Sequence, residues 1–72
     1  MPTLSLRGDS ITLAQAVKVA GLAGTGGQAK IMIRDGDVSV NGEVERRPAR
    51  KLKRGDRFQV PSGVEWTVGD EE

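Results

Sequence analysis

The spacing of apolar residues changes along this chain, and each change predicts a different element. Near the start, Leu4 and Leu6 alternate with polar residues, which is typical of a short edge strand. Over residues 12–20 the apolar residues instead recur at intervals of three and four, which indicates a helix with one apolar face. A second helix is expected over about residues 26–35.

Both helices carry start and stop signals in the sequence. Thr12 and Thr25 stand where an N-cap residue belongs, and each helix is followed by a glycine, which favours the left-handed C-cap conformation. The expected apolar stripes are Leu13, Ala16, Val17 and Ala20 on the first helix and Ala29, Met32 and Ile33 on the second. With the glycine-rich connection between them, the pair is helix-turn-helix-like.

After the second helix the apolar period becomes two. Val38 and Val40 point to one side, and Asn41-Gly42 predicts a type I′ hairpin turn, because both central positions of that turn need positive φ. Val44 begins the return strand, and we expect Val44 and Leu52 to be core anchors.

The last third of the chain predicts two more strands in a single α+β domain. The inward residues are expected to be Phe58 and Val60, then Val64, Trp66 and Val68. A chain of 72 residues allows one domain, here residues 1–72, with an acidic tail at 69–72 that is expected to fray. The predicted fold has two short helices packed on a small, mostly antiparallel sheet that contains the Asn-Gly hairpin.

Charge is concentrated in one stretch that we call the basic segment, residues 46–57, "RRPARKLKRGDR". It holds seven of the eleven lysines and arginines against one acid, Asp56, although the net charge of the chain is only +1. Most charge runs are solvated loops. This one lies between the two expected anchors, so we expect its backbone to be held and its cations to form a surface for a polyanion.

The composition argues against an enzyme. The chain has no cysteine, so no thiol can act as a nucleophile or bind a metal, and it has no histidine, the commonest general base and metal ligand; no cofactor or metal is expected. The glycine-rich stretch at 24–29 follows a helix instead of a strand, so it does not fit a dinucleotide site. Glu43 and Glu45 are expected on a solvated face. No apolar run approaches the length of a membrane span, so a cytoplasmic protein is expected.

Three partner classes remain. Phe58 and Trp66 are expected in the core, so base stacking is not favoured, and structured RNA held through phosphates and 2′-hydroxyl groups fits best. One alternative is a DNA-binding helix-turn-helix that presents the second helix to the major groove. The other is a module that binds an acidic protein. Val19 and Ile31 are the outward apolar residues and form no evident dimer face, so a monomer is expected.

The order of these motifs resembles the S-four domain, an RNA-binding module named after ribosomal small-subunit protein 4. The matching positions, over about residues 12–60, are Thr25, Ala29, Met32-Ile33, Gly36, Val38, Val40, Asn41-Gly42 and Gly55-Asp56 leading to Val60. The small stand-alone bacterial members are the most similar, since they also carry stretches like "GGQAK" at 26–30 and "RRPARKL" at 46–52.

The resemblance implies a non-catalytic protein in which the helix pair and the hairpin loop form one surface for structured RNA, often ribosomal RNA. Ribosomal proteins are a second partner class that it implies. The contact candidates that it implies are Lys18, Gln28, Lys30, Arg34, Arg46, Arg47, Arg50, Lys51 and Arg54. One position departs from the pattern, because Gly26 stands where many members have an arginine. That departure shifts the expected binding towards the basic segment.

Overall fold

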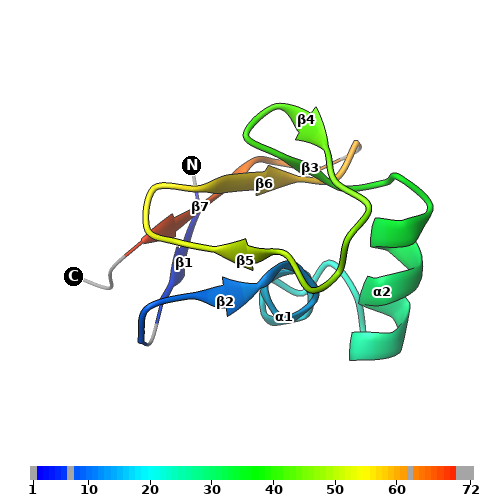
Figure 1. The fold of residues 1–72 in the computed structure, drawn as a ribbon, viewed down its shortest axis with the longest axis horizontal. Helices are drawn as coiled ribbons and strands as arrows, with labels where there is room; N and C mark the ends of the chain where they lie inside the picture. The colour runs from blue at the N-terminus through cyan, green and yellow to red at the C-terminus, as the bar shows by residue number, and fades with distance from the viewer. Residues whose placement is uncertain (1, 7, 62, 70–72) are drawn as a thin grey trace.

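The computed structural model describes residues 2–6, 8–61 and 63–69, and these residues form the expected α+β architecture (Figure 1). The helices are α1 (Leu13–Val19) and α2 (Gly26–Arg34). The strands are β1 (Thr3–Ser5), β2 (Ile11–Thr12), β3 (Ser39–Val40), β4 (Glu43–Val44), β5 (Lys51–Leu52), β6 (Arg57–Gln59) and β7 (Trp66–Gly69). In the acidic tail, Gly69 closes β7, and residues 70–72 lie outside the described residues.

Five strands form one sheet in the order β1-β7-β6-β3-β4. The β1–β7 pair is parallel and the other three pairs are antiparallel, so the expectation of a mostly antiparallel sheet is confirmed. The strand β1 lies at the edge, as its alternation predicts. A second sheet joins β2 to β5 in antiparallel fashion, and the sequence did not predict this pairing.

The predicted signals place the helix boundaries correctly. The Thr12 hydroxyl accepts a hydrogen bond from the Gln15 N–H at 3.2 Å, and Gln15 Oε1 accepts one from the Thr12 N–H at 3.2 Å, which completes a capping box. At α2 the Thr25 hydroxyl accepts from the Gln28 N–H at 3.1 Å. Each helix is followed by a left-handed glycine, with φ +79° at Gly21 and +84° at Gly36.

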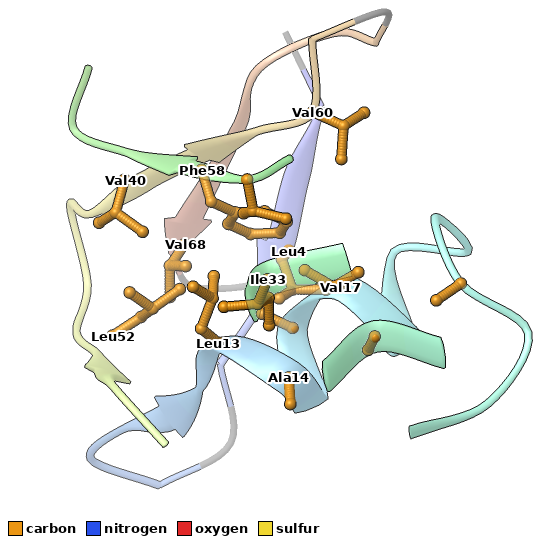
Figure 2. Close-up of a cluster of buried hydrophobic side chains, with 14 of the residues drawn as sticks. Leu4, Leu13, Ala14, Val17, Ile33, Val40, Leu52, Phe58, Val60 and Val68 are labelled. Carbon is orange, nitrogen blue, oxygen red and sulfur yellow. The ribbon is translucent and has the colours of Figure 1, made fainter. Parts of the chain in front are cut away.

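The core lies between the two helices and the sheets (Figure 2). Its largest fully buried side chains come from six different elements or the turns beside them, namely Phe58, Leu13, Ile33, Leu52, Val17, Val38, Val40 and Val68. Each such side chain contributes about 1.5–3 kcal/mol by leaving water. The prediction that Leu52 is a core anchor is therefore confirmed.

The hairpin turn is correctly predicted, but its consequence for Val44 is not. Asn41 and Gly42 have φ of +52° and +87°, and the register pairs Val40 with Glu43 and Ser39 with Val44. Directly opposed residues share a face of the sheet, so Val44 lies on the same outward face as Ser39. Val44 is 58% exposed, and its expected role as a core anchor is wrong.

The last strand packs as predicted at two of its three expected positions. Val68 is buried, and Trp66 is half-buried opposite Phe58, with ring centroids 6.4 Å apart and planes 12° from parallel. Val64 precedes β7 and is 60% exposed, so its inward placement is wrong. Across the described part of the chain, no helix has the length and apolar character that crossing a membrane requires.

Candidate nucleic-acid interface

The first part of the basic segment crosses the beginning of α1 and is attached there by backbone hydrogen bonds. Figure 1 shows the chain running from β4 past α2 to β5. The Leu13 N–H donates to the Arg50 carbonyl at 2.8 Å, and the Ala14 N–H donates to the Pro48 carbonyl at 3.1 Å. Free N–H groups at a helix start need acceptors, and the segment supplies two of them. Its backbone is held in place, as the sequence predicts, although not by Val44.

Arg46 extends from the same segment to the end of α2. Its Nη1 donates to the Arg34 carbonyl at 3.2 Å, where the C-terminal end of a helix favours positive charge. The guanidinium group also lies close over Gly36, since a Cβ atom at that glycine would come within 2.9 Å of Arg46 Nη2. The structure therefore brings two predicted site residues, Arg34 and Arg46, together.

The centre of the segment is organised by Glu45, which was expected on a solvated face. That expectation is wrong, because Glu45 is only 8% exposed. Its Oε1 lies 3.3 Å from Arg50 Nη1 and 3.6 Å from Arg47 Nη2. The sequence carried a signal for this contact, because a two-residue turn that places Val44 outward also places Glu45 inward. Glu43 is exposed as expected.

The end of the segment is tied to the hairpin turn. Asp56 accepts hydrogen bonds from the Lys53 N–H at 2.8 Å and from Asn41 Nδ2 at 3.2 Å, while Asn41 Oδ1 accepts from the Arg57 N–H at 2.9 Å. The hydrogen bond from the Lys53 backbone, aided by Asn41 and by the charges of Arg50 and Lys53, lowers the pKa of Asp56 against the opposing effect of burial. Two residues of the motif series, Asn41 and Asp56, thus serve to lock two turns together.

The remaining cations of the segment lie at its exposed surface. Lys51 is on β5 opposite Thr12, and Lys53 and Arg54 follow it towards the turn. Arg57 lies on β6, where its Nη1 is 3.7 Å from Glu65 Oε1. Of the candidates that the resemblance singles out, Lys51 thus lies beside the start of α1, whereas Arg54 lies in the turn between β5 and β6.

The candidates on the helices fall into different surroundings. Lys30 and Arg34 are exposed on α2. Gln28 is engaged at the beginning of that helix, where its Oε1 accepts from the Gly24 N–H at 2.9 Å. Lys18 lines an open groove of about 760 Å³ between β1, the start of β2 and α1. No hydrogen bond or ion pair among the described residues connects Lys18 to the basic segment.

The two aromatic residues of the chain are not available for stacking on bases. Phe58 is buried, and Trp66 stacks on it from the neighbouring strand. Readers of single strands use exposed aromatic side chains, whereas double-helical RNA is contacted through phosphates and 2′-hydroxyl groups. The surface offers hydrogen-bond donors and positive charge, which suit contacts with phosphates and 2′-hydroxyl groups.

Comparison with known proteins agrees with the motif series. A family model described as the S4 domain matches residues 4–68. The chain is also 37% identical over 57 residues to a Bacillus subtilis (strain 168) protein named "Probable ribosome maturation protein RlbA", and the match covers 79% of this chain and 80% of that protein. The matched range includes both helices, the hairpin and the whole basic segment. The chain therefore belongs to the S4 domain family, whose members are in general RNA-binding.

Proposed function

We propose that this protein is a non-catalytic, monomeric cytoplasmic binder of structured RNA, and that its target is ribosomal RNA in a ribosome or an assembling ribosomal particle. The observation that carries the proposal is the attachment of the basic segment to α1 through the carbonyls of Pro48 and Arg50. Because the backbone is held, it does not have to be ordered when the RNA binds, and the entropic cost of binding is lower.

The proposed surface consists of the five exposed cations of the basic segment that the family resemblance implies, together with the two of α2. Its members are Lys30, Arg34, Arg46, Arg47, Arg50, Lys51 and Arg54. The contact of Arg46 with the main-chain carbonyl of Arg34 supports one continuous surface across the segment and the end of α2. Phosphate contacts of this kind supply affinity and register, and the shape of the folded RNA supplies selectivity.

The proposal that the target is ribosomal is supported by the similarity to the Bacillus subtilis protein. The Bacillus subtilis protein is named for ribosome maturation, and its match to this chain extends over four fifths of its own length. On this proposal the protein would bind ribosomal RNA that is already folded in part, which suits a surface without stacking aromatics.

The proposal is tested by filter-binding titrations with ribosomal RNA fragments over a series of salt concentrations. Affinity should fall with a log–log slope of about −0.7 to −0.9 for each phosphate that is neutralised. A flat salt response would sink the proposal. Competition with duplex DNA tests the helix-turn-helix alternative, and co-purification after nuclease treatment tests binding to an acidic protein.

A pair of charge reversals tests where the surface lies. Lys51→Glu should weaken binding roughly tenfold and make the salt slope shallower by about one contact. Lys18→Glu changes the net charge by the same amount, but Lys18 lines the separate groove, so this variant should weaken RNA binding much less. Equal losses would show that the surface extends to the β1 side of α1. Arg50 is less suitable, because a glutamate there would face Glu45.

A further inference from the structure

Among the described residues, Glu45 is the one charged side chain that the fold buries. Its backbone N–H donates to the Val38 carbonyl at 3.0 Å, which continues the hairpin one residue beyond β4. That register turns the side chain inward, beneath the basic segment. Burying a carboxylate is costly unless charged partners compensate for the lost water, and here two arginines do so.

Both arginines contact the same carboxylate oxygen. Arg50 Nη1 is 3.3 Å and Arg47 Nη2 is 3.6 Å from Glu45 Oε1. The distance between these two nitrogens is therefore at most the sum of the two values. One phosphate group, accepting a hydrogen bond on each side, can bridge such a gap. The Arg50 N–H also donates to the Arg47 carbonyl at 3.1 Å, in a turn that contains Pro48 and keeps the two residues together.

The two guanidinium groups keep donors for a ligand. Each has five N–H donors, and the contact with Glu45 uses only part of them. The Arg47 side chain is 81% exposed and that of Arg50 is 39% exposed. Both therefore reach solvent, while one guanidinium nitrogen of each contacts Glu45.

We infer that Arg47 and Arg50 form a site for a single phosphate group of the RNA backbone, and that Glu45 is the positioning residue that holds both guanidinium groups in place. The inference rests on the proposed function and adds to it a defined subsite with three named members. Arg47 and Arg50 contact the phosphate, and Glu45 acts through them.

Simple charge counting predicts the opposite role for Glu45. A negative charge close to a phosphate site repels the ligand, so removing it should tighten binding. A positioning role predicts weaker binding, because two freed arginines must be ordered again when the phosphate binds. The sign of the effect therefore separates the two explanations.

The deciding variant is Glu45→Gln, which keeps the size of the side chain and one acceptor oxygen but removes the charge. The matched control is Glu43→Gln, two residues earlier, where the glutamate is exposed. In titrations with a ribosomal RNA fragment we expect Glu45→Gln to bind roughly three- to tenfold more weakly, with a shallower salt slope. Glu43→Gln should bind equally well or slightly more tightly.

A second variant does not depend on the fold tolerating a change at a buried position. Replacing both exposed arginines, Arg47→Lys and Arg50→Lys, keeps the charge but removes the planar donor groups. We expect about fivefold weaker binding with little change in the salt slope. Combined with Glu45→Gln, the losses should not add, because the three residues act as one unit.

Two results would overturn the inference while leaving the proposed function intact. One is a folded Glu45→Gln protein, by its thermal unfolding, that binds as well as the Glu43→Gln control. The other is unchanged binding by the double lysine variant. If the wild-type protein fails to bind structured RNA at all, the proposed function falls, and this inference falls with it.

Discussion

The basic segment and the connection between the two helices, residues 20–25, are both rich in turns, but they are held in opposite ways. Among the residues that the structure describes, hydrogen bonds of the helix connection reach only residues next to it in the chain, from Gly21 to Lys18, from Leu22 to Val17 and from Gly24 to Gln28. The basic segment instead contacts α1, the end of α2 and the hairpin turn, all distant in sequence.

The difference shows what each connection can do. A connection whose hydrogen bonds are all local can adjust at a lower cost to the rest of the fold, whereas a segment tied at three distant points presents its side chains in a fixed arrangement. A surface that recognises the shape of an RNA needs the second property. The contrast makes predictions about stability and about binding.

The largest expected effect concerns the apolar residue that anchors each connection. Leu52 is fully buried at the middle of the basic segment, and Leu52→Ala should lower the free energy of unfolding by about 2–5 kcal/mol. Leu22 is only partly buried, and Leu22→Ala should cost about 1 kcal/mol. Urea unfolding of the two variants measures the difference, and equal losses would break the comparison.

The two N-caps provide the next contrast. Thr12→Ala and Thr25→Ala should each cost about 1 kcal/mol of stability. Only Thr12→Ala should also weaken RNA binding, because the N–H groups that hold the basic segment, those of Leu13 and Ala14, follow it directly. Amide exchange at these two positions should become faster in that variant alone. A larger loss of RNA affinity in Thr25→Ala would reverse the assignment.

The start of α2 has space for the arginine that many family members carry. A Cβ atom at Gly26 would meet no heavy atom within 4 Å. Gly26→Arg should tighten RNA binding about threefold and steepen the salt slope by about 0.7–0.9. Gly26→Ala is the control, and it should stabilise the helix by about 0.5–1 kcal/mol without changing affinity. If both variants leave affinity unchanged, α2 begins away from the RNA.

The smallest effect is expected at the far end of the basic segment. The folded protein lowers the pKa of Asp56 from its ordinary value of 3.8, so the carboxylate contributes stability above that value and loses it as the pH falls through the lower, folded one. Thermal unfolding should therefore show a loss below about pH 4 that Asp56→Asn lacks, of about 1 kcal/mol or less. Identical pH profiles would mean that Asp56 does not hold this turn.

The sequence predicts best what is encoded locally. Thr12, Thr25 and the glycines after each helix act within one turn of chain, and Asn41-Gly42 sets its own backbone angles, so these features were predicted correctly. The pairing of β2 with β5 was not predicted. It joins two-residue strands about 40 positions apart, and strands that short carry no periodicity to detect.

The errors at the candidate site have one cause. Val44 was assigned to the core because it is apolar, and Glu45 to solvent because it is charged. The register of the hairpin, already implied by the Asn-Gly turn, sends each of them to the opposite side. The number of cations in the basic segment could be read from the sequence, but the attachment of Arg46 to the end of α2 depends on tertiary packing.

The attachment of the basic segment to α1 has a consequence for how such a protein can diversify. Both acceptors at the start of α1 are main-chain carbonyls, those of Pro48 and Arg50, and every amino acid has one. Side chains of the segment that make no such contact, such as those of Ala49 and Lys51, can therefore be exchanged with little effect on that anchorage. The pattern of charges on the segment can therefore change, in evolution or by protein engineering, to suit a different nucleic acid while the backbone stays attached to α1.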